Sequence, residues 1–257
     1  MKLFDTHTHL NAETFEGREA DLIAQAKAAD VHYMAVVGFD RPTIEKSLAL
    51  SSQYQEIISV CGWHPTEAHT YTPKVEAYIE SLMEEANVKM LGEIGLDYYW
   101  DSATPAQQET AFRRQIAIAK NANIPITIHN RDATEDCYRI LKEEGIPAAG
   151  GIMHSFGENA ESAQKFLDLG MHISFSGVVT FKKTEDVRQA AKIVPKDKLL
   201  IETDAPYLAP EPMRGKENQP AYVKYVAQVL AQTREVSLEE IAQTTTENGL
   251  TLFKWSM

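Results

Sequence analysis

The sequence predicts an α/β protein that forms a single (β/α)8 barrel, also called a TIM barrel, over residues 1–257. Short apolar segments alternate with amphipathic segments along the whole chain, and no low-complexity tract or Pro/Gly/Ser-rich linker divides it. Eight apolar segments are present, each followed by a candidate helix, and eight such units close a barrel. A doubly wound open sheet is the alternative, because the order of elements does not show whether the sheet closes.

The eight candidate strands are short and rich in apolar residues, as expected for strands that are buried on both faces. In chain order they cover residues 2–7, 32–38, 57–64, 88–95, 124–130, 150–156, 171–177 and 199–206. Amphipathic segments with helical spacing lie between them, including residues 19–30, 72–86, 104–123 and 159–170. Pro105 lies near the start of one predicted helix, where its missing amide hydrogen does no harm, and Gly145 lies where another helix should end.

The composition limits the partners and the compartment that can be expected. A formal net charge of -12 provides no general basic surface for a polyanion, so an anionic substrate would have to be attracted by a local feature such as bound cations. Cys61 and Cys137 form no CxxC pair, which predicts reduced thiols. No cationic leader precedes His7 and no apolar run reaches membrane-spanning length, so we expect a cytoplasmic protein, with a monomer as the default state.

Histidines and carboxylates recur at the carboxyl ends of the predicted strands, where barrel enzymes place their active sites. His7 and His9 end the first strand and, being two residues apart, point toward the same face. The later strand ends carry His64, Glu93, Asp97, His129, Arg131, His154, Glu202 and Asp204. The three remaining histidines, at positions 32, 69 and 172, lie near strand starts or in a loop.

This grouping of histidines and carboxylates predicts a metal centre. A single histidine more often satisfies a structural hydrogen bond, but carboxylates packed together at one rim would repel each other without a cation. Four histidines and two carboxylates offer enough donors for two divalent ions if one carboxylate bridges. Two ions about 3.5–4 Å apart activate water for the hydrolysis of phosphoesters or amides. The mixed donor set favours Zn, Mn, Fe, Co or Ni and does not exclude Mg.

The same strand ends resemble the signature blocks of the TatD-type metal-dependent hydrolases, a (β/α)8 family of the amidohydrolase-like group whose characterised relatives are deoxyribonucleases. The blocks read DTHTHL, GWHP, GEIGLDYY, IHNRDA, MHSF, ISFSGVVTF, ETDAPYLAP and RGKENQP, and they run from residue 5 to residue 220 in the family order. The HxH pair alone is common among barrel hydrolases, whereas GEIGLD and ETDAPYLAP are more specific.

The resemblance implies two metal sites and a role for each side chain. One ion would be held by His7, His9 and Asp204, the other by His129 and His154, with Glu93 bridging them. Asp204 would also orient or deprotonate the attacking water, so it and Glu93 are the predicted catalytic residues. His64 and Arg131 would either support the metal ligands from behind or contact the phosphate, for which the guanidinium fork of arginine is suited.

One group of neighbouring side chains keeps two alternative interpretations. Residues 98–100 (Tyr-Tyr-Trp) could stack on an unpaired base, or they could pack on the rim as a lid, which is slightly favoured. Asp97 and Glu202 are expected to orient the metal ligands or Arg131.

We therefore expect a phosphodiesterase that depends on divalent metal ions and trims single-stranded or frayed 3′ DNA ends. The net charge argues against a processive enzyme on long duplex DNA. The first alternative is a hydrolase of a small amide, lactone or aminoacyl ester, since the same pair of metal ions serves a carbonyl group. The second is a metal-binding barrel without catalysis that acts as a scaffold. DNA ends are the expected partner, and neither a membrane nor an obligate protein partner is expected.

Overall fold

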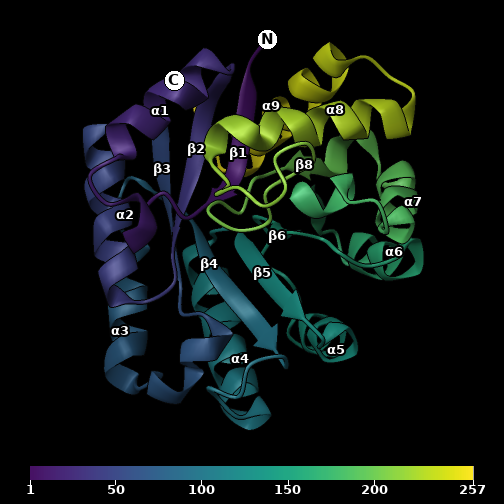
Figure 1. The fold of residues 1–257 in the computed structure, drawn as a ribbon. Helices are drawn as coiled ribbons and strands as arrows, with labels where there is room; N and C mark the ends of the chain where they lie inside the picture. Colours follow the sequence, from purple (N-terminus) through teal and green to yellow (C-terminus); the bar gives the residue numbers. More distant parts are fainter. Residues whose placement is uncertain (257) are drawn as a thin grey trace.

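The computed structural model of the chain, which describes residues 1–256, contains one sheet of eight strands in the order β1 to β8. All seven neighbouring pairs in that order are parallel, and helices lie around the outside of the sheet (Figure 1). This sequential order confirms the predicted barrel, because a doubly wound sheet would reverse its strand order at a switch point.

Each strand is followed by at least one helix. The strands are β1 (Leu3–Thr8), β2 (Val31–Gly38), β3 (Ile57–Cys61), β4 (Val88–Asp97), β5 (Ile126–Arg131), β6 (Gly151–Met153), β7 (His172–Phe175) and β8 (Leu199–Ile201). The α-helices are α1 (Glu19–Ala28), α2 (Arg41–Gln53), α3 (Pro73–Leu82), α4 (Pro105–Ala122), α5 (Thr134–Glu144), α6 (Ala160–Asp168), α7 (Glu185–Ile193), α8 (Val223–Arg234) and α9 (Leu238–Leu252). None of the helices described in residues 1–256 is long and apolar enough to cross a membrane.

Several strands end at residues other than those predicted. β4 continues to Asp97, beyond the predicted end at residue 95, whereas β6 and β8 contain only three residues each. The chain leaves the β conformation soon after these two short strands, since Ser155 and Asp204 have positive φ angles of 42° and 57°. Several candidate site residues therefore lie on bends that follow the strands rather than within them.

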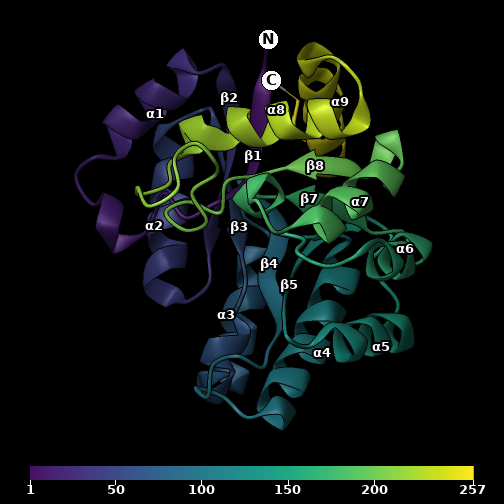
Figure 2. The ribbon, with the colours of Figure 1, turned by 45° about the vertical axis from the view of Figure 1, so that its right-hand side comes forward.

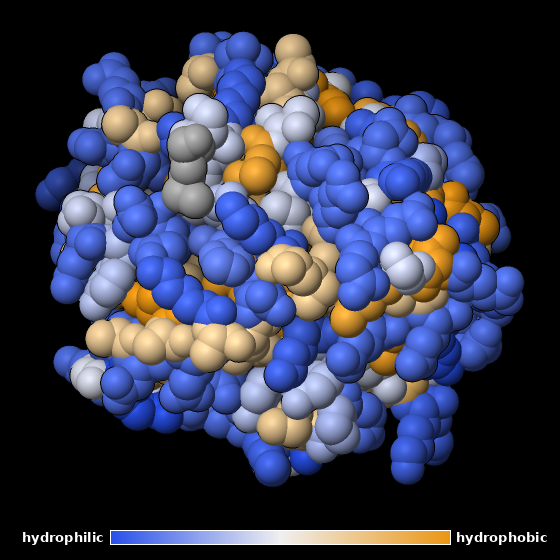
Figure 3. Space-filling view, turned by 90° about the horizontal axis from the view of Figure 1, so that it is seen from above, coloured by the Kyte–Doolittle hydropathy of each residue, from blue (hydrophilic) through white to orange (hydrophobic). Residues whose placement is uncertain are grey.

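Apolar side chains close the barrel at the end opposite the candidate site. Alternate residues of the strands, such as Phe4, Tyr33 and Val60, point into the barrel and form a core of their own. The ring of Phe253, just after α9, lies 5.2 Å from that of Phe4, and Trp255 contacts the same phenylalanine at 5.6 Å. Figure 2 shows α9 beside β1, with both termini at this end. Seen from above, the face that carries the termini is covered mainly by hydrophilic residues (Figure 3).

Hydrogen bonds of the backbone and of one side chain join residues 5–9 to residues 203–205, just after β8. We call this junction the seam. The Asp204 amide donates to the carbonyl of His7 at 2.9 Å, and the His9 amide donates to the carbonyl of Ala205 at 2.8 Å. The Thr203 amide donates to the buried carboxylate of Asp5 at 2.8 Å. The seam therefore holds the first and last strands together at the level of His7 and Asp204.

Candidate active site

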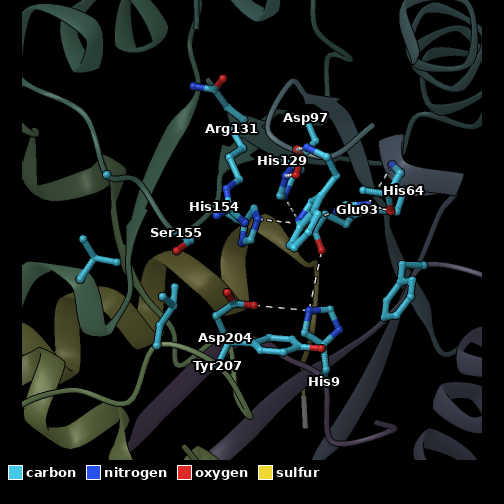
Figure 4. Close-up of a pocket in the computed structure, with 17 residues that line it drawn as sticks. His9, His64, Glu93, Asp97, His129, Arg131, His154, Ser155, Asp204 and Tyr207 are labelled. Carbon is cyan, nitrogen blue, oxygen red and sulfur yellow. Dashed lines mark hydrogen bonds and ion pairs between the residues drawn. The ribbon is translucent and has the colours of Figure 1, made fainter. Parts of the chain in front are cut away.

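A cavity of about 770 Å³ opens at the carboxyl ends of the strands (Figure 4). This volume lies within the range of about 300–1,000 Å³ that is usual for ligand sites. Its walls are supplied by the ends of β4 and β5 and by the loops that follow the other strands. The predicted site residues that line it are His9, His64, Glu93, His129, Arg131, His154 and Asp204. His7 is buried directly beneath, against Glu93.

Glu93, near the end of β4, lies at the centre of the imidazoles. Its Oε1 is 2.7 Å from Nδ1 of His129 and 2.7 Å from Nε2 of His154. Its Oε2 is 3.3 Å from Nε2 of His7 and 3.8 Å from Nε2 of His9. The two oxygens of one buried carboxylate thus face two different pairs of histidines, which is the placement that a bridging ligand requires.

Asp204 faces the first of these pairs from the opposite side. Its Oδ1 is 3.3 Å from Nε2 of His9 and 3.8 Å from Nε2 of His7. The amide of Tyr207 donates to its carbonyl at 2.9 Å, and the bond from its own amide across the seam supports its left-handed backbone. Aspartate tolerates this conformation better than most residues, so the local sequence suits the bend.

Two further carboxylates hold the two histidines that face Oε1 of Glu93, namely His129 and His154. Asp97 accepts a hydrogen bond from Nε2 of His129 at 2.8 Å, and Glu202 accepts one from Nδ1 of His154 at 3.1 Å. Each bond leaves the other ring nitrogen directed at Glu93. This is the placement expected for side chains that orient metal ligands.

Glu93 and the histidines around it shift one another's pKa values. Burial alone would raise the pKa of Glu93, but the nearby charges of His154, His64 and His7 hold that pKa well below its ordinary value. Burial lowers the pKa of His7, and repulsion from His154 lowers it further. Burial would also lower the pKa of His154, but the charge of Glu93 raises it well above its ordinary value. Positive charge beside Glu93 therefore lowers its pKa, and a divalent cation at the same place would act in the same direction.

The donor set fits divalent metal ions. The Nε2 atoms of His7 and His9 lie 3.3 Å apart, and each is 3.3 Å from a carboxylate oxygen, of Glu93 and Asp204 respectively. The lone pairs of these atoms converge on one point, which is the arrangement that a divalent cation binds. Within residues 1–256, three groups of three side chains have donor atoms within 4.8 Å of one another. They are His7, His9 and Asp204; His7, His154 and Glu202; and His64, Glu93 and His129.

His64, predicted either to support the metal ligands or to contact the phosphate, lies beside the candidate donors. Its Nε2 is 3.6 Å from Oε1 of Glu93, and its Nδ1 forms a hydrogen bond of 2.7 Å with the Thr66 hydroxyl. His64 therefore belongs to the donor group of Glu93 and His129. His154 is not in that group, although it approaches the same Glu93 oxygen.

Residues 98–100 do not form the packed lid that the sequence favoured. Tyr98 is turned inward, and its hydroxyl donates to Asp136 at 2.9 Å. Tyr99 and Trp100 remain 53% and 55% exposed, with the guanidinium of Arg131 3.8 Å from the centre of the Tyr99 ring.

Tyr207 is a residue of the cavity wall that the sequence analysis missed. It lies three residues after Asp204, within the ETDAPYL segment, and this position was the available signal. Its ring centre lies 6.1 Å from that of His9.

Comparison with known proteins identifies the group to which this site belongs. The family model described as TatD related DNase matches residues 4–254. The uncharacterized metal-dependent hydrolase YabD of Bacillus subtilis strain 168 is 49% identical over 252 residues, covering 98% of this chain and 99% of that protein. The 3′-5′ ssDNA/RNA exonuclease TatD of Klebsiella pneumoniae strain 342 is 32% identical over 258 residues, covering 98% and 97%.

A solved structure agrees with the sequence relatives. The crystal structure of YJJV, a TatD homologue from Escherichia coli K12, superimposes with a TM-score of 0.94 at 28% identity, covering 99% of this chain and 98% of that one. The chain therefore belongs to the TatD related DNase family of metal-dependent hydrolases.

Proposed function

We propose that this metal-dependent hydrolase is a deoxyribonuclease that removes nucleotides from single-stranded or frayed 3′ ends with two divalent metal ions. The observation that carries the proposal is the position of Glu93, whose two oxygens face separate pairs of histidines. The Klebsiella pneumoniae relative, which is named a 3′-5′ ssDNA/RNA exonuclease, supports the choice of substrate.

In this proposal one ion is held by His7, His9 and Asp204, the other by His129 and His154, and Glu93 bridges them. His64 lies near enough to the second group to serve as a further donor. When bound, the ions would lower the pKa of a water molecule and stabilise the charge that develops on the phosphoryl group.

The protein's own side chains supply the remaining functions. Asp204 acts as general base: burial alone would raise its pKa, but the hydrogen bond from His9 lowers it, so the carboxylate is ready to accept a proton from water. The water oxygen forms a bond to phosphorus as the ester P–O bond breaks, and the leaving ester oxygen takes up the proton that Asp204 has accepted. Arg131 contacts a phosphate oxygen with its guanidinium fork.

The compartment and the oligomeric state are also proposals. We propose a cytoplasmic monomer. Both cysteines are buried and unpaired, which agrees with a reducing compartment.

The test uses a single-stranded oligonucleotide that carries a label at its 5′ end. Metal-loaded protein should shorten this substrate stepwise from its 3′ end, and Glu93→Ala and His129→Ala should abolish cleavage. His69→Ala is the matched control, because His69 is exposed and does not line the cavity.

Two results would refute the proposal. One is cleavage that persists in both ligand variants. The other is turnover of a lactone, amide or aminoacyl ester that neither phosphate nor a nucleotide inhibits, which would favour carbonyl hydrolysis.

A further inference from the structure

Exposed aromatic side chains gather at the mouth of the cavity. Within residues 1–256, five large hydrophobic side chains are exposed, and three of them are the aromatic residues Tyr99, Trp100 and Tyr207. Trp100 and Tyr207 line the cavity, and the ring of Tyr99 lies 4.9 Å from that of Trp100. Exposed aromatic surface beside a polar site indicates that a ligand covers it.

The loop that carries two of these rings is tied to the candidate metal centre. Oδ1 of Asp97 accepts hydrogen bonds from the amides of Tyr99 and Trp100, at 3.0 and 3.1 Å. Oδ2 of the same carboxylate accepts the hydrogen bond from His129. The backbone that carries the two exposed rings is therefore fixed relative to a candidate metal ligand, which favours a binding surface over a loose loop.

Arg131 lies beside the two rings. We call the surface formed by Tyr99, Trp100 and Arg131 the platform. The guanidinium carbon of Arg131 lies 3.8 Å from the centre of the Tyr99 ring and 5.9 Å from that of Trp100. Among the residues that the structure describes, Arg131 has no carboxylate within 4.0 Å. A guanidinium that stacks through its face keeps its in-plane N–H groups available, so it can still contact a phosphate.

A second aromatic surface lies across the cluster. Figure 4 shows Arg131 and Tyr207 on opposite sides of the imidazoles around Glu93. Tyr207 is 57% exposed and follows Asp204 on the β8 loop. A strand whose phosphate reaches the centre would therefore meet an aromatic side chain on either side.

We propose that the platform stacks on a base of an unpaired nucleic-acid strand while Tyr207 contacts the adjoining nucleotide across the candidate metal centre. This inference rests on the proposed nuclease function and specifies its substrate class: unpaired ends, whatever their sequence. Every base has a π-face, so stacking tolerates any sequence. A paired base would first have to leave its duplex. Stacking also supplies affinity that a chain of net charge -12 does not obtain from a basic surface.

The test compares two single-stranded oligonucleotides of equal length and charge. One ends in three thymidines at its 3′ end, and the other ends in three abasic nucleotides. Wild-type protein should show a kcat/KM lower by about 5- to 150-fold on the abasic end, the range that corresponds to the loss of one stacked base.

Trp100→Ala should cause a comparable loss of kcat/KM on the substrate that ends in thymidines. On the abasic substrate this variant should lose little further kcat/KM, because the stacked base is already absent. Trp100→Phe should restore most of the lost kcat/KM. Ile193→Ala is the matched control, because Ile193 is exposed but lies outside the cavity, and it should leave both values at those of the wild type.

Each result has a definite meaning. Equal kcat/KM on the two substrates, or a Trp100→Ala variant that behaves as the wild type does, would overturn the stacking proposal while the nuclease function stands. Failure of metal-loaded wild-type protein to cleave either oligonucleotide would overturn both proposals.

Discussion

Nδ1 of His154 donates a hydrogen bond to Glu202 across 3.1 Å, and its Nε2 faces Glu93 at 2.7 Å. Glu202 is fully buried just after β8 and also accepts the amide hydrogen of Ser155 at 2.8 Å. The ring of His154 is thus held from behind by a carboxylate that does not itself line the cavity. Such an arrangement selects the nitrogen that a histidine presents to a metal ion.

The first prediction follows from this arrangement. Glu202→Gln should lower metal affinity or activity by about 10- to 100-fold, since a neutral amide holds the His154 ring through a weaker hydrogen bond than the carboxylate does. Affinity is measured by competition with a chelator of known affinity. Glu161→Gln, an exposed position on α6, should behave as the wild type does. An unchanged affinity in Glu202→Gln would show that the charge of Glu202 does not contribute to holding the ligand.

A second prediction concerns the contact of β4 with β5. Gly95 has φ 141° and pairs with His129, and a Cβ atom there would lie 2.0 Å from the His129 carbonyl oxygen. Gly95→Ala should therefore lower the free energy of unfolding by about 3 kcal/mol and reduce activity, because it pushes β5 away from β4. Urea unfolding measures this change.

Gly17→Ala is the matched control for Gly95→Ala. Gly17 also has a positive φ, of 76°, but a Cβ atom there would meet nothing within 4 Å. This variant should cost only about 1 kcal/mol of backbone strain. Equal destabilisation by the two substitutions would contradict the steric explanation.

The third prediction is a dependence of stability on pH that comes from His172, at the start of β7. Burial, with help from the charge of Lys198, lowers the pKa of His172 to about 4. Between pH 4 and 6.5 the unfolded chain binds a proton here that the folded chain does not. The free energy of unfolding therefore falls as pH drops through this window, by at most about 3 kcal/mol from this residue.

Urea unfolding at pH 7, 6 and 5 checks this dependence, with His172→Gln beside the wild type. The variant lacks the titrating group, so its stability should fall less on acidification. Parallel losses in the two proteins would assign the acid sensitivity to other residues.

The fourth prediction concerns removal of metal. A ligand that binds only the folded state at 100 times its Kd adds about 2.7 kcal/mol, which corresponds to about 5–11 °C in Tm for a chain of this size. Chelation should lower Tm by this order, and elemental analysis should find two ions per chain before treatment. Glu93→Ala should have a Tm that the chelator hardly changes. A wild-type Tm that does not respond would argue against metal bound in the folded state.

The sequence was sufficient to predict the barrel and the residues that meet at its rim. Strands of a parallel barrel all present their carboxyl ends on one face, so His7, Glu93 and His129 had to converge once the strands were recognised. The strand ends were less predictable. β6 and β8 stop early because the chain bends near Ser155 and Asp204, which have positive φ angles. The spacing of apolar residues, from which the strands were predicted, does not reveal such bends.

Exposure was the property that the sequence could not supply. Whether Tyr99 and Trp100 pack as a lid depends on which side chains from other loops cover them, and such long-range contacts have no local signature. The nearness of His64 to Glu93 depends likewise on how the loop after β3 folds over β4. Family resemblance suggested roles for these positions but did not give their distances.

The seam between the first and last strands has a consequence for biosynthesis. A cation held by His7, His9 and Asp204 would bridge the two edges of the sheet. His7 lies on β1 and His9 just after it, whereas Asp204 follows β8. On the ribosome the two imidazoles emerge long before the aspartate that completes their site. Capture of this cation would therefore belong to the last stage of maturation, when the barrel closes.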